Sequence, residues 1–168
     1  SGKLDMTSGL DEDGKDVLLT ANGELKKEHS SYFYLKKTPW LNTDYIGILV
    51  DDSINKKLNN PLASNQLRNA IGYAIDRRKL VKYLRNGIGC PAENGFIPKG
   101  MPGYDSYKID GYSYDFDKAK SLLAHIDTDN VNITLSATEQ YKTLCEYLQN
   151  QIQQLGVHVD IDIYTSSA

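Results

Sequence analysis

Residues 60–104 read NPLASNQLRNAIGYAIDRRKLVKYLRNGIGCPAENGFIPKGMPGY, and this stretch holds the most regular pattern of the sequence. Ser64 is a suitable N-cap, and the residues after it place apolar side chains on one helix face: Leu67, Ala70, Ile71, Ala74 and Ile75. A second helix is expected to follow, with Asp76 as its N-cap and Gly87 at its end. The stretch therefore predicts two consecutive helices that each bury one face.

The C-terminal part of the chain carries the clearest supersecondary pattern. Apolar and polar residues alternate over 131–135 and again over 157–163, and an apolar helix face runs between them from Tyr141 to Leu155. Gly156 is suited to end that helix. Strand, helix and strand over about 35 residues form a βαβ unit, so we expect two parallel neighbouring strands joined by a right-handed crossover. The pattern predicts an α/β fold.

A long connection runs from Gly87 to Tyr114 and precedes a helix that Asp115 is expected to cap. A connection of this length in a compact domain is usually functional or covers a partner surface. Its tyrosines either form a ligand wall or pin the loop to the surface beneath it, and the second alternative is the simpler one. They are Tyr104, Tyr107, Tyr112 and Tyr114.

The N-terminal third is less regular. Short strands are predicted at Asp16–Thr20 and at Ser31–Leu35, where β-branched, aliphatic or aromatic residues cluster. A third strand is predicted at Asp44–Val50 and is expected to be more deeply buried. The residues from Asp51 to Pro61 show little periodicity and are expected to form a loop.

Length and composition describe an ordinary globular chain. Its 168 residues fit one domain or a piece of a larger protein, and 40% are hydrophobic and 24% charged, which excludes disordered, collagen-like and coiled-coil chains. Nineteen Lys and Arg against 22 Asp and Glu give a net charge of -3. Because nucleic-acid binding requires a clustered basic surface, we expect no nucleic-acid partner.

The ends of the sequence bear on localisation. No window has 18 uninterrupted apolar residues, and the N-terminus lacks the basic start, apolar core and cleavage site of a secretion signal. The first residue is Ser1 and the last residues follow a strand-like run directly, so we expect both ends to be cuts inside a longer protein. A signal could then lie upstream of this chain.

Motifs for catalysis and for cofactors are missing from the sequence, which has no dinucleotide or phosphate-binding glycine loop, no nucleophile elbow and no zinc-binding helix. We therefore expect no catalytic residue, no cofactor and no metal. His158, Asp160 and Asp162 resemble half of a metal site, but polar residues at period two on a half-exposed strand account for them.

The sequence contains two cysteines, Cys90 and Cys145. They could form one disulfide in an oxidising compartment. Cys90 lies in a Gly-Cys-Pro loop, however, whereas Cys145 lies on the apolar face of a predicted helix. We favour two unpaired and partly buried thiols, because free cysteine behaves as a small hydrophobic residue.

Several linked motifs carry a resemblance to a known family. Pro61, Arg68-Asn69-Ala70, Tyr73-Ala74-Ile75-Asp76-Arg77, Gly87 and Pro98 occur in the order of the extracytoplasmic solute-binding proteins of ABC transporters for oligopeptides, dipeptides and nickel. The later YDFDKAKSLLA, residues 114–124, is similar to another element of that family. The resemblance covers residues 40–168 well and residues 1–39 loosely.

The resemblance implies a fold and a function. Residues 1–168 would form a single α/β lobe, the second lobe of a type 2 periplasmic-binding-protein-like fold, with a mixed sheet, flanking helices and a C-terminal βαβ unit. The whole protein would capture oligopeptides or similar small solutes in the periplasm or at the cell surface, with or without a lipid anchor. It would act as a monomer and deliver the solute to a membrane permease. One lobe holds half of the ligand contacts, so the lobe alone would bind weakly.

Candidate ligand-binding residues are Trp40, Asn42 and Tyr45, because an aromatic wall with an amide can hold a peptide or a sugar. The alternative for Trp40 is packing in the core or between lobes. The strand here ends in Asp51-Asp52, where the family has a Phe-Asn or similar pair, so this sequence departs from the family at the ligand side. Arg68 is expected to bridge to a carboxylate or carbonyl near the helix turn.

Two other functions are compatible with such a fold. The same lobe could serve as the ligand sensor of a transcriptional or signalling regulator, in which case a DNA-binding or signalling domain would accompany it. An enzyme on an α/β scaffold would need a nucleophile and a base, and its first candidates would be Asp51, Asp52 or His158. The solute itself does not follow from the fold.

Overall fold

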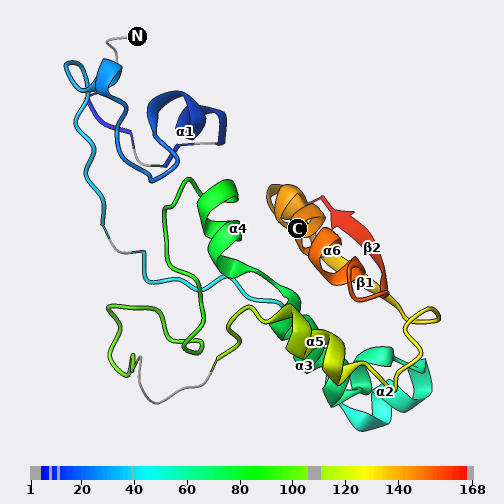
Figure 1. The fold of residues 1–168 in the computed structure, drawn as a ribbon. Coiled ribbons are helices and arrows are strands. Elements are labelled where there is room, and N and C mark those ends of the chain that lie inside the picture. The colour runs from blue at the N-terminus through cyan, green and yellow to red at the C-terminus, as the bar shows by residue number, and fades with distance from the viewer. Residues whose placement is uncertain (1–4, 8, 11, 39, 106–110, 166–168) are drawn as a thin grey trace. The chain divides into compact units, whose positions relative to one another are not determined.

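The computed structural model describes residues 5–7, 9–10, 12–38, 40–105 and 111–165. They belong to two compact units. The first unit comprises Ser1–Trp40 and Arg78–Pro91, and the second comprises Leu41–Arg77 and Ala92–Ala168. Figure 1 follows the elements along the chain. None of the helices in the described ranges has the length and apolar character needed to cross a membrane.

Two helices, α3 (Asn65–Ala74) and α5 (Phe116–Leu122), pack against each other in the second unit. α3 begins as predicted, because the Ser64 hydroxyl accepts a hydrogen bond from the N–H of Leu67 at 3.3 Å. The Asp115 carboxylate caps α5 by accepting from the N–H of Lys118 at 2.9 Å. The apolar stripe predicted for α3 and the residue after it is buried throughout: Leu67, Ala70, Ile71, Ala74 and Ile75.

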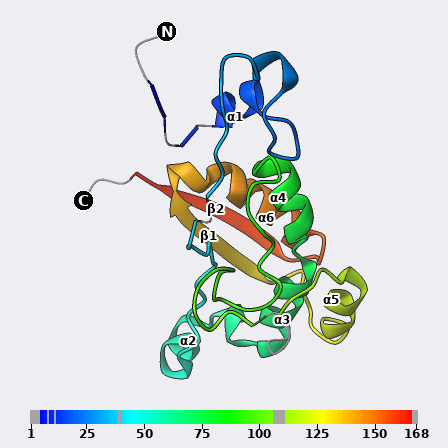
Figure 2. The same cartoon turned by 90° about the vertical axis from the view of Figure 1, so that its left-hand side faces the viewer.

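The βαβ unit is confirmed. β1 (Asn132–Thr138) and β2 (His158–Tyr164) are parallel, with Ile133 opposite Val159, and α6 (Lys142–Gln153) packs against both strands (Figure 2). Ile133 and Val159 are buried under α6, whereas the polar residues that alternate with them are exposed. The sheet of the described residues consists of these two parallel strands, so the C-terminal βαβ unit is present among them and the mixed sheet that the resemblance implies is not.

The loop predicted over 51–61 is wrong, because α2 (Asp52–Leu58) and the 3₁₀ turn η2 (Pro61–Ala63) occupy it. Asp51 caps α2 by accepting a hydrogen bond from the N–H of Ile54 at 2.9 Å. Asn55 is buried and donates to the carbonyl oxygen of Leu49 at 3.2 Å. A short helix whose buried residue is polar leaves no apolar periodicity in the sequence, which explains the error.

The strand predicted at Asp44–Val50 does not form in the described chain, where this segment has no assigned helix or strand. Nor is it buried as expected: Tyr45, Ile46, Leu49 and Val50 are exposed. A strand is defined by its pairing, and a sequence with strand propensity stays unpaired until a neighbouring strand satisfies its backbone groups.

In the first unit the strand predicted at Asp16–Thr20 is also wrong. Helix α1 runs over Glu12–Leu18, and a single antiparallel bridge joins Leu19 to Leu25. A short apolar run such as Val17-Leu18-Leu19 suits a helix end as well as a strand, and periodicity alone does not separate the two. A turn follows, in which Gly23 takes a φ of +70° and donates its N–H to the carbonyl oxygen of Thr20 at 2.9 Å.

The remaining elements of the first unit are the 3₁₀ turn η1 (Lys27–His29) and helix α4 (Arg77–Leu84), which begins at the unit boundary. Residues 31–35, predicted as a strand, have no regular structure. α4 ends as predicted: the N–H of Gly87 donates to the carbonyl oxygen of Val81, six residues back, at 2.9 Å, and Asn86 before it is left-handed.

Candidate functional site

One candidate site lies along the extended segment 41–50 of the second unit. The Thr43 hydroxyl donates to the carbonyl oxygen of Phe96 at 2.8 Å. The rings of Tyr45 and Phe96 meet edge to face, with centroids 5.3 Å apart and planes at 62°. Residue 96 belongs to the long glycine-rich connection, so this connection fixes the aromatic part of the segment.

The same segment reaches the carboxyl end of β1. Tyr141, three residues beyond Thr138, donates from its hydroxyl to the Asp44 carboxylate at 3.4 Å, and the amide of Asn42 donates to the same oxygen at 3.4 Å. The Thr138 hydroxyl is buried at this end and makes no hydrogen bond within the described residues. In open α/β sheets, ligands bind outside the carboxyl ends of the strands.

Helix α6 begins directly after Tyr141, and the side chain of Tyr141 makes no capping hydrogen bond. The first turn of a helix carries a partial positive charge, which favours an anionic group. The Asp44 carboxylate supplies the opposite charge nearby. This end of the βαβ unit can therefore offer one position for a cation, one for an anion and the Tyr45–Phe96 pair as a wall.

The three residues predicted as ligand-binding are all exposed. Trp40, the last residue of the first unit, is 86% exposed, so packing in the core is not its role in this chain. Tyr45 is 71% exposed, and Asn42 is exposed beside Asp44. The structure thus joins Asn42 to Asp44 and Tyr45 to Phe96. Ligand contact by the three residues remains a prediction.

Sequence reasoning missed Asp44, Phe96 and Tyr141. A signal for Tyr141 was present, because it begins the predicted helix that follows the first strand of the βαβ unit, on the side where parallel sheets place their ligand sites. Asp44 lies beside two of the predicted residues. Phe96 had no local signal, since its partners lie about 50 residues earlier in the chain.

Tyr112 fastens the long connection to the surface beneath it, which is the simpler of the two roles considered for the loop tyrosines. Its ring lies against Gly72, where a Cβ atom would meet the ring at 2.6 Å, and contacts the Tyr73 ring at a centroid distance of 5.1 Å. Its hydroxyl donates to the Asn69 side chain at 2.6 Å. Tyr107 lies outside the described residues. The connection is therefore anchored on α3 just before Asp115.

Arg68 performs the structural role expected of it. Its guanidinium donates to the carbonyl oxygens of Leu62 and Ala63, both at 2.8 Å, and so ties η2 to α3. Asp76 is buried, and its carbonyl oxygen accepts a hydrogen bond from the Tyr147 hydroxyl at 2.9 Å. Burial raises the pKa of Tyr147 to about 12, with a smaller contribution from Asp76. These residues join η2 to α3 and the end of α3 to α6.

The polar face of the β pair does not assemble a metal centre. The His158 imidazole lies 3.2 Å from the Asp160 carboxylate, which also accepts from the Asn132 amide at 3.2 Å. Across the described residues, no three or more His, Cys, Asp or Glu side chains group so that they could hold a metal ion. Both thiols are free, with Cys90 exposed and Cys145 buried.

An α/β unit that ends in a parallel βαβ pair, with polar and aromatic groups outside its carboxyl edge, matches one lobe of a type 2 periplasmic binding protein. The solved structure of the PBP AgaA from A. tumefaciens R10, in complex with agropinic acid, superposes with a TM-score of 0.56 at 32% identity. The match covers 66% of this chain and 23% of that chain.

The chain belongs to the bacterial extracellular solute-binding proteins of family 5, because the model of the middle region of that family matches residues 1–168. The match confirms the resemblance and includes residues 1–39. The dipeptide-binding protein of Escherichia coli K12 is 28% identical over 138 residues, 77% of this chain and 24% of the relative. The glutathione-binding protein GsiB of Salmonella typhimurium is 31% identical over 105 residues, 60% of this chain and 20% of the relative. The chain thus spans about a quarter or less of these relatives.

Proposed function

We propose that this chain is part of a binding protein that captures oligopeptides or similar small solutes outside the cytoplasmic membrane for import by an ABC transporter. The family match over residues 1–168 carries the proposal. The names of two relatives point to short peptides, namely dipeptides and glutathione. None of the three relatives described above is named as an enzyme or a regulator, so neither alternative gains support.

The geometry supports a specific way of holding such a solute. The Asp44 carboxylate is suited to accept hydrogen bonds from a peptide ammonium, and the first turn of α6 is suited to a carboxylate. Tyr45 and Phe96 offer a wall for an apolar side chain, and Asn42 adds an amide that can donate and accept.

The wider setting follows from the same proposal. The protein acts as a monomer in the periplasm or at the cell surface, with or without a lipid anchor. It presents the closed, loaded form to a membrane permease, because closure of two lobes on a solute is the change that a transporter can read. No residue of this chain is assigned a catalytic role, and no cofactor is required.

The test is a thermal-shift screen of the complete protein that carries this chain, against di- to pentapeptides, sugars and nickel chelates. A ligand at a hundred times its dissociation constant adds about 2.7 kcal/mol of stability. Asp44→Asn should reduce the shift with a peptide, whereas Asp129→Asn, an exposed turn residue, should not. A clean melt with no shift by any peptide would contradict the proposal.

A further inference from the structure

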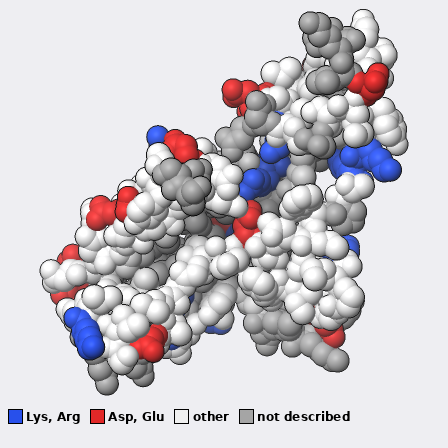
Figure 3. Space-filling model, turned by 180° about the vertical axis from the view of Figure 1, so that it is seen from behind, with Lys and Arg blue, Asp and Glu red and all other residues white. Residues whose placement is uncertain are grey.

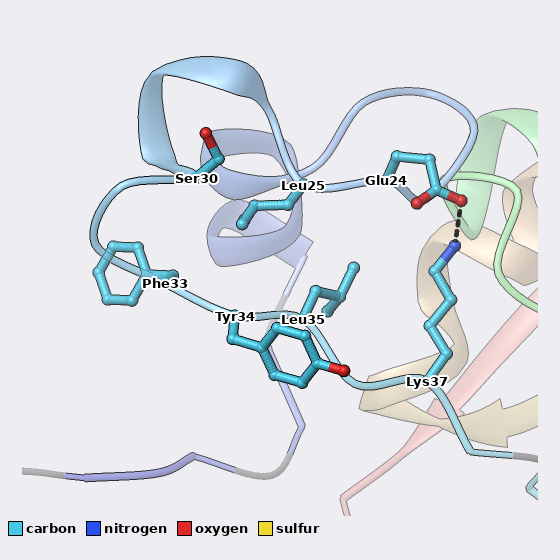
Figure 4. Close-up of a pocket in the computed structure, with 7 residues that line it drawn as sticks. All are labelled: Glu24, Leu25, Ser30, Phe33, Tyr34, Leu35 and Lys37. Atoms are coloured by element: carbon cyan, nitrogen blue, oxygen red, sulfur yellow. Dashed lines mark hydrogen bonds and ion pairs between the residues drawn. The ribbon is translucent and has the colours of Figure 1, made fainter.

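The first unit contains a hollow that the proposed function does not use. Its volume is about 530 Å³, within the range of about 300 to 1,000 Å³ typical of small-ligand sites. Figure 4 shows the residues around it. Glu24 and Lys37 line its charged end, and the rest of its lining is mostly apolar: Leu25, Ser30, Phe33, Tyr34 and Leu35.

The charged end holds two opposite charges side by side. The Lys37 ammonium lies 2.6 Å from one oxygen of the Glu24 carboxylate, and these side chains are 47% and 70% exposed. Such an exposed pair contributes about 0–1 kcal/mol to stability, so a ligand can rearrange it at little cost. Their bond uses one of three ammonium N–H groups and one of about four acceptor positions on the carboxylate. Both groups can therefore bind a second ionic group without parting.

The apolar end begins next to this pair. Leu25 and Leu35 line the hollow from the two segments on either side of it, and Phe33 lies at the end away from the ion pair (Figure 4). Tyr34 lies below Leu35 in the same view, and both aromatic side chains are exposed. Exposed apolar groups gathered around a concave surface are typical of binding sites.

We propose that this hollow binds a free amino acid with an aliphatic or aromatic side chain. Its ammonium donates to the free oxygen of Glu24, its carboxylate accepts from Lys37, and its side chain lies among Leu25, Leu35 and Phe33. A ligand with only an amine would bind Glu24 but not Lys37, and a ligand with only a carboxylate would bind Lys37 but not Glu24. The ends of a peptide are too far apart, because each residue adds about 3.3–3.6 Å of chain.

The proposal is independent of the proposed function. It uses residues of the first unit only, whereas Asn42, Asp44 and Tyr45 belong to the second. A peptide-induced thermal shift that depends on Asp44 can therefore be present or absent whatever the hollow binds. The two proposals fail in separate experiments.

The test is an NMR titration of the ¹⁵N-labelled protein with L-phenylalanine. We expect saturable shifts of the backbone amides of residues 24–37. Phenethylamine, 3-phenylpropionate and the dipeptide Phe-Phe should each bind about tenfold more weakly, because each lacks the paired head group. Glycine, which lacks the side chain, should also bind about tenfold more weakly. Glu24→Gln and Lys37→Gln should each weaken the binding of L-phenylalanine about fivefold, which is the effect expected from losing one exposed charge interaction.

Two neighbouring variants serve as controls. Lys27→Gln and Glu28→Gln remove the same charges from exposed positions of η1 outside the hollow, and both should bind L-phenylalanine like the wild type. The proposal is overturned if L-phenylalanine gives no saturable shift, if the shifts map outside residues 24–37, or if phenethylamine binds equally well. The comparison of ligands on the wild-type protein decides the matter even if a variant fails to fold.

Discussion

The hydroxyl of Tyr147, on α6, donates a hydrogen bond to the backbone carbonyl oxygen of Asp76 at 2.9 Å. Asp76 lies between α3 and α4, and its own N–H donates to the side chain of Gln151, also on α6, at 3.4 Å. Two side chains of α6 thus hold the backbone of one residue. The βαβ unit and the helix junction are joined at this point, 71 and 75 residues apart in sequence.

Replacing Tyr147 with phenylalanine should lower the free energy of unfolding by about 1 kcal/mol, the usual worth of a hydrogen bond to a half-buried group. It should also change the pH dependence. The pKa of Tyr147 in the folded protein, about 12, lies above its ordinary value of 10.0. The stabilisation by its hydroxyl is therefore complete below pH 10 and is lost as the pH rises toward 12. Urea denaturation at pH 8 and pH 11 measures both effects. Tyr164→Phe, at the exposed end of β2, should change neither, and an equal effect of both variants would contradict the assignment.

Replacing Gly72 with alanine should lower the stability of the protein, the opposite of the usual effect of this substitution in a helix. Alanine normally stabilises a helix interior by about 0.5–1 kcal/mol relative to glycine. At residue 72, however, the new methyl group would overlap the Tyr112 ring, so Gly72→Ala should destabilise the protein and release residues 111–115 to protease. The double variant Gly72→Ala, Tyr112→Ala should be more stable than Tyr112→Ala alone. Additive effects in this cycle would show that the ring does not lie on the glycine.

Arg68 should not tolerate lysine. One guanidinium nitrogen, Nη1, donates to both carbonyl oxygens, and the other, Nη2, donates to the side-chain oxygen of Asn65 at 3.4 Å, whereas an ammonium group has a single nitrogen for all three acceptors. We expect Arg68→Ala to cost about 1–3 kcal/mol, since acceptors lose their partner, and Arg68→Lys to recover only part of the loss. Chemical denaturation checks the order of the three proteins. Lys99→Ala, at an exposed loop position, is the control and should leave stability unchanged.

The two thiols should react at very different rates. Cys90 is exposed, whereas Cys145 is buried and burial raises the pKa of its thiol, which lowers the thiolate fraction at neutral pH. Iodoacetamide at pH 7.5 should therefore alkylate Cys90 at least about tenfold faster than Cys145, as mass spectrometry of the peptides can show. Urea should equalise the rates. Absence of labelling at both residues until a reductant is added would indicate a disulfide instead.

Residues 1–168 alone should bind peptide weakly or not measurably. Solute-binding proteins enclose their ligand between two lobes, and one lobe offers half of the contacts. Isothermal titration calorimetry should detect a much larger affinity for the complete protein than for this chain with the same peptide. Tight binding by the isolated chain would refute the idea that a second lobe completes the site.

The parts of the fold that sequence analysis predicted correctly are those whose signals are local. Ser64, Asp115 and Gly156 mark element ends by their own chemistry, and the alternation around residues 133 and 159 defines the parallel strands. The errors at Asp16–Thr20 and Asp44–Val50 arose where pairing, not propensity, decides the structure. Strand propensity was present in both segments, but among the described residues Asp44–Val50 pairs with no strand and Leu19 makes only a single bridge to Leu25.

Only some residues of the candidate site could be predicted, for the same reason. Tyr45 and Asn42 could be chosen from residue type alone. Phe96, which contacts Thr43 and Tyr45, comes from a loop 53 residues after Thr43, and Tyr141, which donates to Asp44, lies just beyond β1 and 97 residues after Asp44. Contacts over such separations depend on how helices and strands pack, and a single sequence contains no direct record of that packing.

The segment at Asp44–Val50 also has a consequence for synthesis of the protein. Residues 46–50 are uncharged and prone to pair as strands, which is the composition of aggregation-prone sequences. At about 5–20 residues per second, the ribosome synthesises Tyr141 roughly 5–20 s after this segment. During that time the hydrogen bond from Tyr141 to Asp44 cannot form. Asp44 before it and Asp51-Asp52 after it carry charge at each end. These aspartates are suited to act as gatekeepers that keep the nascent chain from associating with its neighbours.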